Sequence, residues 1–125
     1  NSFCRCYNIR QCIGNNLENV GCFAFKNCFN LKDINIENVD MLNKNVFNYC
    51  GLATLRSNCT QIFNNAITWN KQLEYLNLPN IIEFDADVIN QCDNLKQIRM
   101  PKLEKLTGEL PEHIQVTTDS SEFLK

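Results

Sequence analysis

The chain has 125 residues, which fits a single domain, and its formal net charge of -2 is close to neutral. Basic and acidic residues are interleaved, without the basic stripe of a nucleic-acid-binding protein or an acidic tail. No run of about eighteen apolar residues is present, so we expect no membrane insertion. The sequence begins with neither Met nor a secretory signal, which predicts either a processed product or a piece cut from a longer protein.

A period of 22 residues organises most of the chain. Cys6, Cys28 and Cys50 follow one another at this spacing, and apolar residues recur at matching places between them. The period predicts one domain, 1–125, with five repeats at 7–28, 29–50, 51–70, 71–92 and 93–114. The third repeat has lost two residues, so we expect its geometry to differ from that of the others.

The repeat at 29–50 is the clearest copy of the unit. The alternation Ile34-Asn35-Ile36 predicts a short strand with its two isoleucines in the core. Val39 and Leu42 then follow at three-residue steps, which carry the chain around a bend. One such unit cannot bury its own apolar side, so it must stack on neighbours, as in a solenoid.

The two ends depart from the repeat. The chain opens in the middle of a repeat, as if an array had been cut. The apolar pattern stops after Ile114, and the polar segment 115–125 is expected to be either a cap over the last repeat or a frayed tail. Open ends of a solenoid also favour end-to-end self-association through exposed strand edges.

Several segments resemble the BspA-like class of leucine-rich repeats. They are Leu31 to Ile36 with Val46-Phe47 and Cys50, Leu73 to Leu78 with Cys92, and Ala24-Phe25-Lys26-Asn27-Cys28. Pro79 and Pro101 follow their strands directly, where that class commonly has Pro. The resemblance covers residues 2 to about 114. It departs from the class at Asn43 and Asp85, where the usual Gly is missing.

The resemblance implies an α/β leucine-rich-repeat solenoid. Its expected form is a curved right-handed superhelix, with a parallel β-sheet on the concave face and short helical or irregular turns on the convex face. Proteins with these repeats are often found on microbial cell surfaces, in adhesion or host contact. This favours a cell-surface or secreted location, whereas a ladder of buried thiols would also suit the cytoplasm, and localisation stays open.

Cysteine is the main candidate for reactive chemistry. Cys6, Cys28, Cys50 and Cys92 share one repeat position, and Cys12 and Cys59 occupy apolar positions, so we expect these six to pack in the core. Cys4 and Cys22 align with lysines and are expected to be exposed; a disulfide between them is one alternative. A metal or redox site built from Cys4, Cys6, Cys12 and Cys22 is another, but the Cys-x-x-Cys spacing of a structural zinc site is absent.

Two further sets of residues are interpreted as structural. Asn16, Asn38, Asn58 and Asn80 recur just before the bend, where Asn side chains bond to nearby backbone. Tyr49 and Trp69 share a position on the convex turns, where an aromatic ring can cover the edge of the core.

The candidate binding residues lie on the concave face, beside the buried strand positions. Solenoids use this face for extended binding, and it includes Tyr and Arg, which are enriched at interfaces. The predicted site comprises Asp33, Asn35, Thr54, Arg56, Tyr75, Asn77, Gln97 and Arg99. A flanking row is formed by Arg10, Lys32, Ala53, Glu74 and Lys96.

Catalysis has little support in the sequence. The chain has one histidine, His113, and no Gly-rich phosphate loop, so we expect no enzymatic activity, no cofactor and no metal. The sequence favours a recognition module for a protein or glycan partner, with no role in nucleic-acid binding. The alternative is a structural spacer whose concave face binds nothing.

Overall fold

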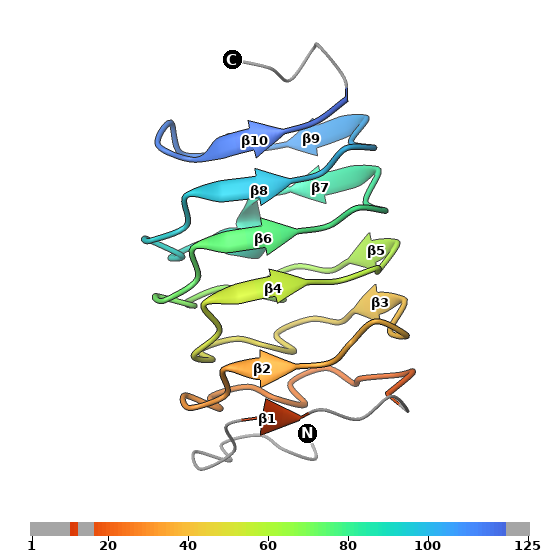
Figure 1. Cartoon of the computed structure of the whole chain (residues 1–125), viewed down its shortest axis with the longest axis vertical. Coiled ribbons are helices and arrows are strands. Elements are labelled where there is room, and N and C mark those ends of the chain that lie inside the picture. The colour runs from red at the N-terminus through yellow and green to blue at the C-terminus, as the bar shows by residue number, and fades with distance from the viewer. Residues whose placement is uncertain (1–10, 13–16, 120–125) are drawn as a thin grey trace.

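The computed structural model describes residues 11–12 and 17–119, which coil into a parallel β-solenoid (Figure 1). One side of the coil carries the front strands: β1 (Gln11–Cys12), β2 (Asp33–Ile34), β4 (Thr54–Arg56), β6 (Tyr75–Asn77), β8 (Gln97–Arg99) and β10 (Gln115–Thr117). The next side carries the side strands: β3 (Met41–Leu42), β5 (Gln61–Ile62), β7 (Glu83–Asp85) and β9 (Lys105–Thr107). Turns close the third side, with one 3₁₀ helix, η1 (Ala86–Ile89).

The register of the front strands follows the repeat. Gln11 pairs with Asp33 on β1 and β2, and Thr54, Tyr75 and Gln97 form one row across β4, β6 and β8. Equivalent positions of successive repeats therefore lie side by side, as the 22-residue period predicts. This arrangement is that of a leucine-rich-repeat solenoid, with little helix on the turn side. The side strands were not predicted: the sequence indicated only a bend there.

The segment after Ile114 begins with a strand that the apolar pattern did not predict. Gln115 pairs with Gln97, so β10 adds a further strand to the end of the front sheet. Val116, in the middle of β10, is half-buried and packs against the core. Residues 115–117 therefore extend the front sheet by one strand.

The short repeat at 51–70 interrupts both ladders at different places. Its front strand β4 pairs forward with β6, but β2 lies in a separate sheet with β1. Its side strand β5 pairs backward with β3, whereas β7 pairs with β9. A coil that is two residues shorter cannot follow both neighbours around its whole circumference. It therefore stays paired with one neighbour on each side and leaves an opening toward the other.

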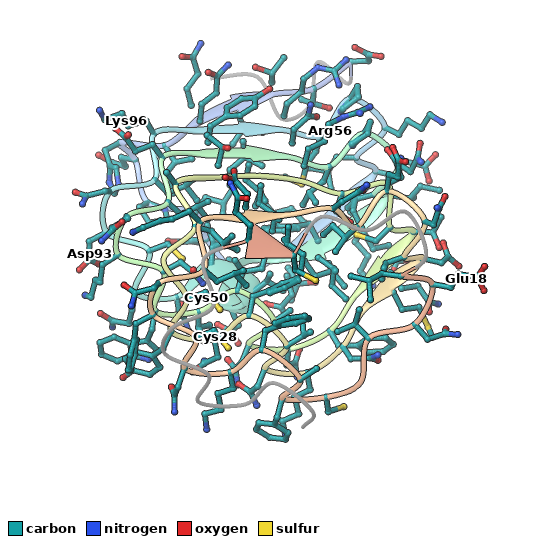
Figure 2. All side chains as sticks on the ribbon, turned by 60° about the horizontal axis from the view of Figure 1, so that its bottom comes forward. Glu18, Cys28, Cys50, Arg56, Asp93 and Lys96 are labelled. Atoms are coloured by element: carbon teal, nitrogen blue, oxygen red, sulfur yellow. The ribbon has the colours of Figure 1, made fainter. Side chains whose placement is uncertain are left out.

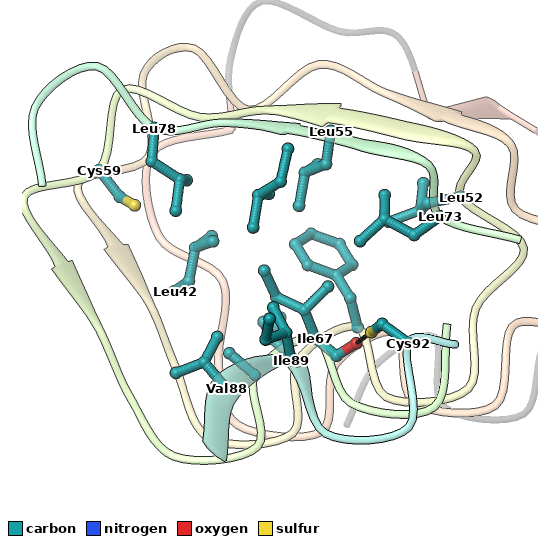
Figure 3. Close-up of a cluster of buried hydrophobic side chains, with 14 of the residues drawn as sticks. Leu42, Leu52, Leu55, Cys59, Ile67, Leu73, Leu78, Val88, Ile89 and Cys92 are labelled. Atoms are coloured by element: carbon teal, nitrogen blue, oxygen red, sulfur yellow. Dashed lines mark hydrogen bonds between the residues drawn. The ribbon is translucent and has the colours of Figure 1, made fainter. Parts of the chain in front are cut away.

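The interior of the coil is a continuous apolar core (Figure 3). Leu55, Leu76 and Ile98, at the expected strand positions, are fully or almost fully buried, whereas Ile34 is half-buried and packs against the core. Leu73 and Leu95 recur at the start of each repeat and are also inside. Each aliphatic side chain that is buried in this way stabilises the fold by about 1.5–3 kcal/mol, so the stacked repeats stabilise one another.

The cysteine position of the repeat forms hydrogen bonds as well as apolar contacts. The Cys50 thiol donates to the carbonyl oxygen of Phe25 at 3.1 Å, and Cys92 donates to that of Ile67 at 3.3 Å, the contact dashed in Figure 3. Asn70 stands at the same position in the short repeat and donates to the carbonyl oxygens of Phe47 and Ile67. Each repeat thus contacts the backbone of the one before it. Asn70 also has a cost, because its Oδ1 is buried without a hydrogen-bond partner.

The asparagines before the bend also connect neighbouring repeats. Asn58 donates to the carbonyl oxygen of Glu37, and Asn80 donates to that of Asn58, both at 3.2 Å. The expectation that these amides bond to backbone is confirmed for Asn58 and Asn80. The carbonyl that each one meets belongs to the preceding repeat rather than to its own turn.

The turn side uses left-handed backbone conformations in the first four repeats. Non-glycine residues with positive φ are Phe23, Asn27, Asn45, Tyr49, Asn65, Trp69 and Gln91. Asn tolerates this conformation better than most residues, which explains three of the seven. The aromatic and Gln residues there must be held by their surroundings, since a bulky side chain disfavours positive φ.

The close approach of the short repeat to its neighbour predicts a strong effect of a single methyl group. A Cβ added to Gly51 would lie 2.3 Å from the Phe29 carbonyl oxygen, whereas one added to Gly21 would have no heavy atom within 4 Å. We expect Gly51→Ala to lower the free energy of unfolding by about 1–3 kcal/mol through overpacking. Gly21→Ala should leave it within about 0.5 kcal/mol in the same urea titration. Equal effects of the two substitutions would contradict this account of the short repeat.

The donor role of the cysteine position predicts an order of stability at residue 70. Asn70→Ala removes both hydrogen bonds and should cost about 1–3 kcal/mol in urea unfolding. Asn70→Cys should cost less, because a thiol can donate as Cys50 and Cys92 do and the buried Oδ1 disappears. If the alanine and cysteine variants unfold at the same urea concentration, the hydrogen bond at this position contributes nothing.

Candidate binding face

The predicted binding residues form two parallel rows on the outer surface of the front sheet. Thr54, Tyr75 and Gln97 make one row, continued by Gln115 on β10. Arg56, Asn77 and Arg99 make the other, continued by Thr117. In each of the strands β4, β6 and β8 the central residue is buried and the flanking residues are exposed or half-buried. The structure therefore brings six of the eight predicted residues together on one sheet.

The other two, Asp33 and Asn35, lie across the opening between β2 and β4. The Asp33 carboxylate accepts a hydrogen bond from the Gln11 side chain at 3.4 Å, and the backbone amide of Asn35 donates to the Cys12 carbonyl oxygen. Asp33 belongs to β2 of the β1–β2 sheet, and Asn35 follows directly after that strand, so neither is part of the four-stranded sheet. The opening therefore divides the predicted face: Asp33 and Asn35 lie on one side of it, and the other six residues lie on the other.

Two hollows mark this opening, and Arg56 lines both of them. One, of about 250 Å³, also contains Lys32, Asp33 and Thr54; the other, of about 300 Å³, contains Glu37 and Asn58. Arg56 is exposed and forms no ion pair with any residue that the structure describes. Its guanidinium is therefore available for a carboxylate or another planar acceptor. Figure 2 shows Arg56 near one end of the front strands and Lys96 near the other.

Other charged side chains of the face have polar partners, and one of these contacts is an ion pair. Arg99 donates to the Asn77 side chain at 3.3 Å, and Lys96 pairs with Glu74 at 2.7 Å. Lys32 reaches across the short repeat to Gln72, at 2.8 Å. Such exposed contacts contribute little stability, but they fix where the side chains lie. Arg10, from the flanking row, lies outside the described residues.

Glu37 and Asn58 line the opening but were not predicted as site residues. The alternation of the strands could not find them, because both come after their strand ends. The shortened third repeat was the available signal, since it is the cause of the opening. Its consequence for the surface depends on which neighbour each strand stays paired with, and spacing does not determine that.

Exposed aromatic side chains form a stack along the turn side. Tyr49 and Trp69 are parallel, with ring centroids 5.1 Å apart, and Phe29 meets Tyr49 edge-on. The ammonium group of Lys71 lies 4.9 Å from the Trp69 centroid. The rings of Tyr49 and Trp69 cover each other's faces, and with Lys71 the stack joins three successive repeats. Tyr49 and Trp69 thus lie on the turns, where the sequence predicts them.

The cysteines are mostly buried and unreactive. Cys28, Cys50, Cys59 and Cys92 are inside the coil, Cys12 is half-buried and Cys22 is exposed. Burial raises the pKa of Cys50 to about 12, with a contribution from nearby Cys28, and that of Cys92 to about 11. Figure 2 shows Cys28 and Cys50 in the interior, whereas Glu18 and Asp93 project from the coil. Cys4 and Cys6 lie outside the described residues, so a Cys4–Cys22 disulfide stays a prediction.

Metal-binding groups and membrane-spanning helices are both absent from the described part of the chain. No group of three or more Cys, His, Asp or Glu side chains there could hold a metal ion. His113 is exposed and lines a hollow of about 130 Å³ with Glu109 and Cys92. None of the helices described is long and apolar enough to span a bilayer.

A coil of parallel strands that present polar rows on one face defines a repeat protein of the leucine-rich type. The model of the BspA-type leucine-rich repeat region matches residues 1–110 in six copies. The chain belongs to this family, and its proteins are generally non-enzymatic.

A solved structure of a leucine-rich repeat protein from Bacteroides ovatus shares the fold. Its TM-score to this chain is 0.56 at 21% sequence identity, which shows the fold alone. The match covers 93% of this chain and 41% of the other, so this chain spans less than half of that protein's length. No curated protein matches the sequence.

The buried thiols predict a loss of stability at high pH. Their pKa is raised above the unfolded value of 9.0, so the unfolded chain releases these protons first. The stabilisation is complete below pH 9 and is lost as pH rises toward 11–12. Each thiol should lower the free energy of unfolding by up to about 1.4 kcal/mol per pH unit in this window.

Urea unfolding between pH 8 and pH 11 measures this effect. Because Lys and Tyr also titrate there, the comparison is between Cys50→Ala and Cys22→Ala. The Cys50 variant should show a shallower decline than the wild type, and the exposed Cys22 variant should not. Parallel declines in all three proteins would show that the buried thiols are not responsible.

Proposed function

We propose that this chain is a non-enzymatic recognition module that binds a protein or glycan partner on its front face, the outer surface of the front strands. The observation that carries the proposal is Arg56, an exposed cation that has no ion pair among the described residues and lines both hollows at the opening between β2 and β4. A carboxylate of a protein or an acidic glycan would satisfy this guanidinium. The front strands, held by the buried core, keep the neighbouring polar side chains in place for such a contact.

Tyr75 supports the proposal from the middle of the face. It is half-buried on β6, between Thr54 and Gln97, and presents a rigid ring with a hydroxyl group. Tyr and Arg are the residue types that most often dominate binding energy at interfaces. Asp33, Asn35, Asn77 and Arg99 would surround these two residues as polar contacts.

We also propose that the protein associates with itself, through a different part of the surface. In the described part of the chain, β10 is one of the two outer strands of the four-stranded front sheet and lies at its C-terminal end. Outer strands offer free backbone groups to another chain, so end-to-end association is expected at β10. The proposed location at a cell surface, in adhesion, rests on the family resemblance.

Substitutions on the front face test the proposal. A glycan array and affinity capture with mass spectrometry would first identify ligands of the wild-type protein. Arg56→Ala and Tyr75→Ala should each weaken binding of these ligands by about 30-fold, the scale of a 2 kcal/mol hot spot. The matched controls are Lys44→Ala and Tyr49→Ala, which remove an exposed cation and an exposed ring from the turn side.

The alternative function, a structural spacer, predicts a different result. If every ligand binds both front-face variants as well as the wild type, the front face is not the recognition surface. If no ligand is found by either method, the spacer becomes the better description of the chain.

A further inference from the structure

A second opening lies on another side of the coil, between the side strands β5 and β7. It forms a hollow of about 580 Å³, larger than either hollow on the front face. Its walls are Thr60 to Phe63 from the short repeat and Ile82 to Asp85 from the next one, with Thr107. In Figure 1, β5 and β7 are consecutive on this side, yet they belong to different two-stranded sheets. We call this hollow the side cleft.

Backbone groups of two strand edges point into the side cleft. The backbone amides of Gln61 and Phe63 donate hydrogen bonds toward the β3 side. The backbone N–H and C=O of Ile62, which lies between them, therefore face the opposite way, toward β7. Next to β7, the Ile82 carbonyl oxygen accepts from the backbone amides of Glu104 and Lys105 on the β9 side. The backbone N–H and C=O of Glu83, the next residue, therefore face β5. Facing edges of this kind can pair with an added extended chain.

The side chains of the cleft combine exposed apolar surface with negative charge. Phe63 is 44% exposed and Ile82 is 46% exposed, and they flank the cleft from its two walls. Its charged lining residues are the carboxylates Glu83 and Asp85. Asp85 caps η1 by accepting from the Asp87 amide, whereas Glu83 forms no ion pair within the described residues. Among the described residues, the cleft therefore offers apolar contact, a carboxylate without an ion pair and open strand edges together.

We propose that the side cleft binds an extended segment of another protein with alternating apolar and basic side chains. The segment pairs its backbone with the free edge of β5 or β7. Its apolar side chains contact Phe63 and Ile82, and a Lys or Arg side chain pairs with Glu83. Alternation follows from the geometry of a strand, whose successive side chains point to opposite sides. This site is separate from the front face and does not depend on the function proposed there.

Fluorescence anisotropy with labelled ten-residue peptides tests the proposal. A peptide of alternating Lys and Val should bind the wild-type protein at least ten-fold more tightly than one of alternating Glu and Val. N-methylation of alternate amides in the Lys-Val peptide should also weaken binding at least ten-fold, because it removes donors needed for strand pairing. If the N-methylated peptide binds equally well, or the two peptides do not differ, the proposal is wrong.

Variants locate the binding on the molecule. Glu83→Lys should reverse the preference toward the Glu-Val peptide, whereas Glu18→Lys, with the same change of charge at an exposed site outside the cleft, should not. Ile82→Ser should weaken Lys-Val binding, and Met41→Ser, at a comparably exposed residue of β3, should not. Arg56→Ala, on the front face, should leave binding of the Lys-Val peptide unchanged.

Two results would overturn the proposal at this stage. Lys-Val binding that is insensitive to both Glu83→Lys and Ile82→Ser would place the peptide elsewhere. Self-association of the wild-type protein that Glu83→Lys abolishes, measured by sedimentation without peptide, would show that the occupant is a second copy of this chain.

Discussion

Every part of this fold depends on the mutual burial of neighbouring repeats. A single repeat presents apolar side chains to one interior and has no opposite layer of its own to cover them. Each coil is therefore stable only against the coils before and after it, through apolar contact and through hydrogen bonds such as that from Cys50 to Phe25. Because a contact between repeats involves both of them, a change in the length of one repeat must alter the surface of its neighbours.

The 20-residue repeat shows how such a change produces openings rather than loss of the fold. The interior stays continuous through it, since Leu52, Leu55 and Ile67 are as buried as their equivalents in longer repeats. What it gives up is strand pairing, once on the front side and once on the next side. Exposed backbone can hydrogen-bond to water, whereas exposed apolar core cannot be compensated in this way. The two openings therefore arise at the perimeter, where their cost is small and a ligand can reach them.

The repeat register was readable from the sequence because burial acts at fixed intervals. Ile36, Leu78 and Met100 must face inward for the coil to close, so their spacing records the fold directly. The rows of the front face follow from the same register, as the pairing of Thr54 with Tyr75 confirms. The side strands and β10 could not be predicted in this way. β3 and β5 have two residues each, too few for an alternation, and β10 follows a shorter interval with polar residues on either side of Val116.

The openings could not be located from the sequence for a further physical reason. Two missing residues predict that the short coil fits its neighbours imperfectly, but they do not say where the mismatch is accommodated. That choice depends on contacts that spacing does not record, such as Gly51 lying against the Phe29 carbonyl and the Asn70 amide bridging the carbonyls of Phe47 and Ile67. These contacts hold the turn of the short repeat against the preceding repeat. With that turn held, β4 follows the next repeat and β5 the preceding one, which separates the two openings onto different sides of the coil.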